Sequence, residues 1–121
     1  VIKNADERNM LGISRAIQDL SGRARSKQLK PDEVQGGTFT ITNPGIFGAL
    51  WGLPIISQPQ VAILGVGTVE KRVVVVDDMI AIRPMCVLTL GYDHRLIDGA
   101  DAGRFLQAIK DRLQNFEESW V

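Results

Sequence analysis

The run VAILGVG, Val61–Gly67, constrains the fold more than any other stretch of this sequence, because it is almost entirely apolar. Successive side chains of a strand point to opposite faces of a sheet. A strand without polar positions therefore needs apolar cover on both faces. We expect Val61–Gly67 to be a strand that is buried on both sides.

Two helices are predicted from apolar residues that recur at steps of three and four. Asn4 or Asp6 is the expected N-cap of the first helix, and Pro31 is expected to end it, because the residue before a proline avoids the α region. The second helix starts at Gly99. The apolar stripes are Met10, Ile13, Ile17, Leu20 and Ala24 for the first helix, and Ala102, Phe105, Leu106, Ile109, Leu113 and Phe116 for the second.

Three further strands are predicted from β-branched and alternating residues. They are TFTIT at Thr38–Thr42, VEKRVVVV at Val69–Val76, and MIAIRPMCVLTLGY at Met79–Tyr92. Asp77 and Asp78 mark a hairpin turn between the last two. The order helix, strand, long loop, three strands, helix indicates an α+β fold in which helices cover one face of a mixed sheet.

The long loop, residues 43–60, is apolar although glycines and prolines interrupt it. Such loops are commonly functional or packed against a partner. Its apolar members are Ile46, Phe47, Leu50, Trp51, Leu53, Ile55 and Ile56.

Charge and cysteine content narrow the function classes. Fourteen basic and 14 acidic residues among 121 give a net charge of +0, which predicts no nucleic-acid or anionic-membrane partner. No stretch has the length of a membrane-spanning helix.

Cys86 is the single cysteine, which excludes an internal disulfide, and its apolar surroundings predict a buried structural thiol. The basic cluster near the end of the first helix is expected to be a solvated face, with a docking patch for an acidic partner as the alternative; it comprises Arg23, Arg25, Lys27 and Lys30.

Two motifs are candidates for chemistry. GVGT at Gly65–Thr68 lacks the third glycine of a dinucleotide-binding turn and precedes a β-branched run, so we interpret it as structural. His94, the only histidine, closes an apolar strand within YDHRLIDGADAGRFL, and Asp98 and Gly99 follow it. His94 is either a catalytic base or a structural strand-end residue. Asp98 either caps the last helix and fixes the loop, which is the favoured role, or contacts the imidazole directly.

The segment DHRLIDGADAGRF resembles the His-x-x-x-Asp-Gly signature of the dihydrolipoamide acyltransferases, the E2 components of the 2-oxo acid dehydrogenase complexes. LKPDEVQGGTFTITNPGIFG, PIISQPQVAILGVGTVEKR and the C-terminal helix resemble the same catalytic domain, so the likeness covers essentially the whole chain. It implies a two-layer, CoA-dependent acyltransferase fold like that of chloramphenicol acetyltransferase. Family catalytic domains are roughly twice this length. Together with the start at VIKNADERN, this leads us to expect residues 1–121 to be the C-terminal part of one, without lipoyl and subunit-binding domains.

The resemblance also implies the chemistry. His94 would take the proton from a thiol of dihydrolipoamide or coenzyme A, since free thiols, with pKa values near ~8.5, are mostly protonated at neutral pH. Thr42 would donate its hydroxyl to the oxyanion; without the resemblance it would be an ordinary strand threonine or a partner of the NPG turn. Asp98 completes the catalytic set. The lipoyl group would sit on a separate domain, coenzyme A would be a substrate, and no metal is expected.

The implied assembly is a homotrimer with active sites between neighbouring subunits, built into an octahedral or icosahedral core. The lipoyl domain and the E1 and E3 enzymes of the complex would be the other partners, in the bacterial cytoplasm or the mitochondrial matrix. The motifs favour succinyl as the acyl group, with acetyl and branched-chain acyl groups as alternatives. A non-catalytic core scaffold is the alternative function, and an acyltransferase for a small free acceptor ranks below it.

Overall fold

The computed structural model describes all of residues 1–121. The chain divides into two compact units, Phe39–Ala108 and Val1–Thr38 with Ile109–Val121. The helices are α1 (Met10–Arg25) and α2 (Gly99–Gln114), the strands are β1 (Thr40–Thr42), β2 (Ala62–Val66), β3 (Glu70–Val76), β4 (Met79–Met85) and β5 (Leu88–Tyr92), and the short 3-10 helices are Ala5–Glu7, Pro31–Glu33, Pro44–Phe47 and Glu118–Trp120.

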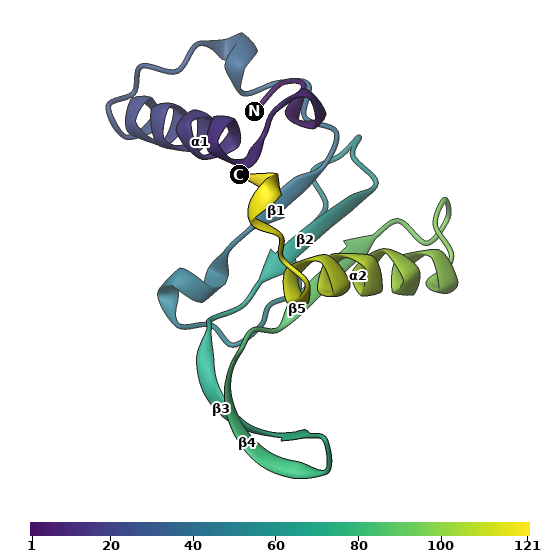
Figure 1. The fold of residues 1–121 in the computed structure, drawn as a ribbon. Helices are drawn as coiled ribbons and strands as arrows, with labels where there is room; N and C mark the ends of the chain where they lie inside the picture. Colours follow the sequence, from purple (N-terminus) through teal and green to yellow (C-terminus); the bar gives the residue numbers. More distant parts are fainter. The chain divides into compact units, whose positions relative to one another are not determined.

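The unit Phe39–Ala108 is built on a three-stranded mixed sheet in the order β1-β2-β5 (Figure 1). β1 runs parallel to β2, and β5 runs antiparallel to it. Ala62, Ile63 and Leu64 of β2 are each at most 7% exposed, so this part of the run Val61–Gly67 is buried on both faces, as expected. Val61, just before β2, is exposed, contrary to the expectation. The α+β fold with a mixed sheet is confirmed.

The glycines of the GVGT motif are required by close packing. A Cβ on Gly65 would lie 2.5 Å from the hydroxyl of Thr89 on β5. A Cβ on Gly67 would lie 1.9 Å from the carbonyl oxygen of Leu50, because the long loop runs directly against the end of β2. The hydroxyl of Thr89 donates to the carbonyl of Gly52 at 2.8 Å and ties the loop to the sheet. The structural interpretation of GVGT is confirmed.

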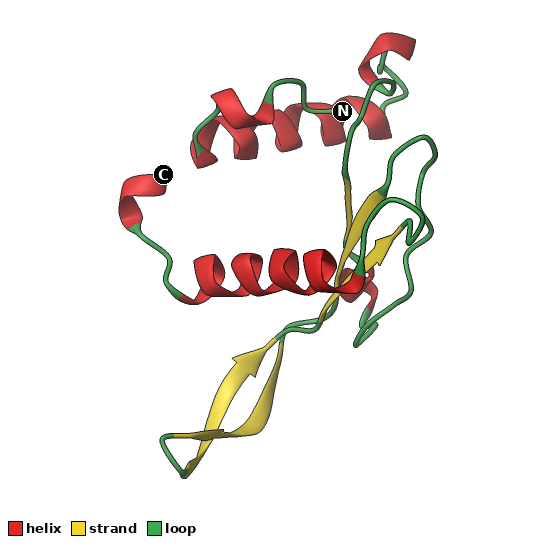
Figure 2. Ribbon diagram, turned by 90° about the vertical axis from the view of Figure 1, so that its right-hand side faces the viewer, coloured by secondary structure: helices red, strands yellow, loops and turns green.

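The hairpin β3–β4 forms a separate two-stranded sheet (Figure 2). Asp77 and Asp78 have φ values of 49° and 60°, the left-handed conformation that a type I′ turn needs at both central positions. The predicted turn is therefore confirmed. The apolar run 79–92, predicted as one strand, is two: β4 pairs with β3, whereas β5 joins the other sheet.

Cys86 lies in the break between these strands and is exposed, so the prediction of a buried thiol is wrong. The apolar neighbours that suggested burial belong to strands of two different sheets. Its Sγ donates to the carbonyl oxygen of Gly67 at 3.2 Å.

Helix α1 begins later than predicted. Its N-cap is Asn9, whose side chain accepts from the backbone N–H of Gly12 at 2.9 Å, and neither Asn4 nor Asp6 caps it. Asn4 instead precedes the 3-10 helix Ala5–Glu7. Several short polar residues crowd this region, and each has a side chain that can cap.

Helix α1 also ends earlier than predicted, at Arg25 and not at Pro31. Lys27 adopts φ 58°, and the N–H groups of Lys27 and Gln28 bond to the carbonyls of Ala24 and Arg23. This is the Schellman arrangement, in which glycine usually holds the left-handed position. Pro31 begins a 3-10 helix.

Arg23 is held by two carboxylates and is not a freely solvated cation. Its guanidinium lies 2.8 Å from Asp19 and 2.6 Å from Glu33, and its side chain is 30% exposed. The Arg23 hydrogen bonds, helped by the Lys30 backbone N–H, lower the pKa of Glu33 to about 2. The expectation of a solvated face is therefore wrong for Arg23, which links α1 to the 3-10 helix Pro31–Glu33.

Candidate active site

His94 lies in the turn between β5 and α2 and is exposed. β5 ends at Tyr92, and the next backbone N–H, that of Asp93, donates to the carbonyl of Val61 at 2.8 Å. The carbonyl of Asp93 accepts from the N–H groups of Leu96 and Ile97, both at 3.0 Å. The chain thus turns sharply at the end of the sheet and presents the imidazole outside it, open to a reactant.

Asp93 and Arg95, the residues on either side of His94, form an ion pair with each other. Arg95 donates from Nε to Oδ1 of Asp93 at 2.9 Å and from one terminal nitrogen to Oδ2 at 2.7 Å. Oδ1 also accepts from the backbone N–H of Arg95 at 3.0 Å. The Arg95 guanidinium and backbone N–H lower the pKa of Asp93 to about 2, so the carboxylate is ionised at neutral pH. We call this pair the Asp93–Arg95 clamp.

Tyr92 packs on the imidazole from the strand side. The two ring centroids are 5.4 Å apart with the planes tilted by 41°. A Cβ on Gly99 would lie 3.8 Å from the Tyr92 hydroxyl, so the phenol reaches the start of α2. Tyr92, Asp93 and Arg95 were not predicted from the sequence as site residues. An aspartate that directly follows a strand and precedes an arginine by two positions is the signal that could have revealed this turn.

Asp98 caps α2. Its Oδ1 accepts from the backbone N–H of Asp101 at 2.8 Å, and its carbonyl accepts from that of Ala102 at 3.1 Å. This is the capping role favoured from the sequence, and no hydrogen bond joins Asp98 to the imidazole. By starting the helix there, Asp98 fixes the far end of the turn that carries His94.

Thr42 does not lie beside His94. It is the last residue of β1 and is half-buried, in register with Gly65 of β2, which in turn faces Thr89 of β5. Thr89 precedes Tyr92 by three positions, about 10 Å along a strand, and His94 lies beyond Tyr92. Within one chain the two candidate residues therefore occupy opposite ends of the sheet.

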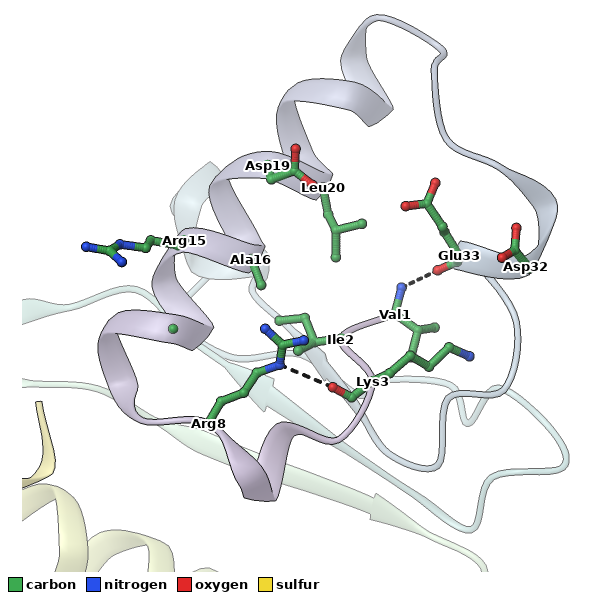
Figure 3. A pocket seen from close by; sticks show the side chains of 11 residues that line it. Val1, Ile2, Lys3, Arg8, Arg15, Ala16, Asp19, Leu20, Asp32 and Glu33 are labelled. Atoms are coloured by element: carbon green, nitrogen blue, oxygen red, sulfur yellow. Dashed lines mark hydrogen bonds between the residues drawn. The ribbon is translucent and has the colours of Figure 1, made fainter.

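An open pocket lies in the unit that holds α1 (Figure 3). It has a volume of about 530 Å³ and lies between the start of the chain, α1 and the 3-10 helix Pro31–Glu33. None of His94, Asp98 and Thr42 lines it. No group of three or more histidine, cysteine, aspartate or glutamate side chains is arranged to hold a metal ion. None of the helices is long and apolar enough to cross a membrane.

Curated relatives match nearly the whole chain. The acetyltransferase component of the pyruvate dehydrogenase complex of Mycobacterium tuberculosis is 56% identical over 119 residues, which are 94% of this chain and 22% of the relative. The succinyltransferase component of the 2-oxoglutarate dehydrogenase complex of Buchnera aphidicola is 47% identical over 116 residues, 96% of this chain and 28% of the relative. The chain thus spans about a quarter of these relatives.

Solved structures share the fold. A probable dihydrolipoamide acetyltransferase from Listeria monocytogenes superposes with a TM-score of 0.93 at 48% identity, over 97% of this chain and 50% of that one. The Azotobacter vinelandii dihydrolipoamide acetyltransferase gives 0.88 at 40% identity, over 93% and 46%; that work concerns the role of a serine, a histidine and an asparagine in its catalytic mechanism. The cubic core of a pyruvate dehydrogenase multienzyme complex gives 0.89 at 39% identity, over 93% and 46%.

The sequence model of one family covers the complete chain, residues 1–121. The chain therefore belongs to the 2-oxoacid dehydrogenase acyltransferase family, by its catalytic domain.

Proposed function

We propose that residues 1–121 form the C-terminal part of a catalytic domain that transfers an acyl group between a dihydrolipoyl group and coenzyme A. The observation that carries this proposal is the exposed imidazole of His94, held at the end of β5 between the Asp93–Arg95 clamp and the capped start of α2.

The spacing of the polar residues supports the same function. In the Azotobacter vinelandii enzyme the serine precedes the histidine by 52 positions, and the asparagine follows it by four. Here Thr42 precedes His94 by the same interval, and Asp98 follows it by the same interval. Serine and threonine both offer a hydroxyl, and asparagine and aspartate both offer an oxygen that can cap a helix. The matching residue types can thus perform the same tasks.

His94 would act as the general base. Its imidazole takes the proton of the attacking thiol, a task for which histidine is suited near neutral pH. The thiolate sulfur then forms a bond to the thioester carbonyl carbon, whose oxygen becomes negative. The Thr42 hydroxyl donates to that oxygen. When the carbonyl reforms, the other sulfur leaves and His94 returns the proton to it, so atoms and charge balance.

A second copy of the chain would complete this site. His94 and Thr42 lie at opposite ends of one sheet, so the histidine of one chain requires the threonine of a neighbour. A homotrimer provides such a neighbour for every site. The relative that forms a cubic core supports assembly of trimers into an octahedral particle, with the icosahedral form as the alternative. A lipoyl domain and the E1 and E3 enzymes would be its partners.

Acetyl is the acyl group that we propose to test first. The relatives at 53–56% identity carry acetyltransferase names, whereas those at 44–47% carry succinyltransferase names. The sequence motifs alone favoured succinyl, which is the second candidate, and branched-chain acyl groups are the third. A bacterial chain would act in the cytoplasm, and a eukaryotic one in the mitochondrial matrix.

The test is turnover of acetyl-, succinyl- and isobutyryl-CoA with free dihydrolipoamide, using the full chain as its gene encodes it. His94→Ala is expected to abolish transfer without changing assembly, and Thr42→Ala to lower kcat by about 10²–10³, the usual effect of losing one oxyanion donor. Thr42→Ser keeps the hydroxyl and serves as the control. If His94→Ala retains near-normal turnover, His94 is not the general base and its catalytic assignment fails. If the unmodified protein assembles without turnover, the core-scaffold alternative stands.

A further inference from the structure

Asp93 organises the turn that carries His94 through almost all of its polar groups. Its N–H donates to the carbonyl of Val61, the residue just before β2, and its own carbonyl accepts from Leu96 and Ile97 on the far side of His94. Its side chain is only 20% exposed although it is ionised, whereas that of Arg95 is 81% exposed. The carboxylate thus belongs to the interior of the turn, and the guanidinium covers it from the solvent side.

The length of the aspartate side chain matches this task. A carboxylate on one methylene reaches the backbone N–H two residues ahead, which is the geometry of an Asx turn. The second oxygen is then left for the guanidinium, and the fork of Arg95 satisfies both oxygens at once. Glutamate would displace the carboxylate from the turn, and asparagine would keep the turn bond but lose the ion pair.

Global stability does not account for such a clamp. An ion pair with one member this exposed contributes little to the free energy of unfolding. What the clamp does restrict is the backbone immediately before and after His94. A general base must come within hydrogen-bond reach of the proton that it takes, and a displacement of about 1 Å costs up to about a hundredfold in rate.

We propose that the Asp93–Arg95 clamp positions His94: by locking the residues on both sides of the imidazole, it holds the base where the thiol proton is presented. This inference rests on the proposed function and extends it to two residues, neither of which touches the reacting atoms.

A double-mutant cycle in the full chain tests it, with kcat and KM measured for acyl-CoA and dihydrolipoamide. Asp93→Ala and Arg95→Ala are each expected to lower kcat by about tenfold with KM changed less than about twofold, since they loosen the base and leave substrate binding intact. The kcat of the double variant is expected to be no lower than that of the less active single variant, because the pair acts as one unit. Asp93→Asn, which retains the turn bond, is expected to recover part of the loss.

Glu70 and Arg72 on β3 supply a matched control, since they form an ion pair at the same spacing of two residues, 2.7 Å apart and away from His94. Glu70→Ala is expected to leave kcat within about twofold, in keeping with the small effect of an exposed pair.

Three results overturn the inference: an unchanged kcat in both clamp variants, losses that multiply in the double variant, or a rise in KM that accounts for the loss, which would make Arg95 a binding residue. Thermal unfolding of each variant shows whether it is folded. Should Asp93→Ala fail to fold, Arg95→Ala and Asp93→Asn decide the question by the same kinetic criteria. His94→Ala distinguishes failure of the proposed function from failure of the positioning role. If His94→Ala is inactive while the clamp variants are fully active, only the positioning role fails.

Discussion

At the scale of single residues, some glycines are needed because they let another backbone segment pack closely. Gly67 lies where the long loop meets the end of β2, and a Cβ there would overlap the carbonyl of Leu50. Gly103 lies on the exposed side of α2 with no atom within 4 Å of a Cβ, apart from its own helix backbone. Gly67 is therefore required by close packing, whereas nothing around Gly103 prevents a side chain there.

Gly67→Ala and Gly103→Ala are expected to change stability in opposite directions. Gly103→Ala should raise the free energy of unfolding by about 0.5–1 kcal/mol, because alanine is the better helix former. Gly67→Ala should lower it by about 1–3 kcal/mol, the usual cost of overpacking. Denaturant titration of both variants measures the difference. Equal effects would contradict the steric reason for Gly67.

At the scale of elements, α1 is joined to the 3-10 helix Pro31–Glu33 by charge. Glu33 titrates at about 2 instead of 4.5, because Arg23 and the Lys30 backbone N–H favour its ionised form. A carboxylate with a lowered pKa stabilises the folded state above its ordinary pKa. That contribution declines as the pH falls below 4.5 and is gone once it passes about 2.

Carboxyl NMR titration should therefore give Glu33 a midpoint near 2. Replacing its main partner, as in Arg23→Gln, is expected to move the midpoint up toward 4.5. A midpoint near the ordinary value in the unmodified protein would show that the ion pair does not persist in solution.

Elements with a strong local signal could be predicted from the sequence, and those set by distant contacts could not. The apolar run at β2 predicts burial on both faces because composition alone decides it. The end of α1 was missed because Lys27, not glycine, holds the left-handed position. The division between β4 and β5 was missed because apolar residues continue through it, while the two strands pair with different partners.

In the candidate site, too, the residues with a local sequence signal could be predicted and the arrangement set by distant contacts could not. His94 and Asp98 could be found because they lie in one short motif. The Asp93–Arg95 clamp depends on how two side chains fold back on their own turn. The separation of Thr42 from His94 follows from the register of three strands, which no local pattern specifies.

For the whole molecule, the hairpin β3–β4 presents a strongly exposed apolar surface. Val73 pairs with Ile82 and Val75 with Ile80, and all four side chains are between 63% and 82% exposed. A lone two-stranded hairpin is marginally stable in water, and an apolar face of this kind marks an interaction site. This surface is consistent with a chain that functions as part of a larger assembly.

The placement of Thr42 and His94 at opposite ends of the sheet has a genetic consequence. If each site takes its histidine from one chain and its threonine from the next, then a His94→Ala chain and a Thr42→Ala chain can rescue each other. Coexpressed in equal amounts and mixed at random, they should restore about a quarter of the sites in a cyclic assembly. Separately purified homomers, combined after assembly, serve as the control and should remain at the sum of their own activities. Failure of the coexpressed chains to complement would mean that both groups of a site come from the same chain.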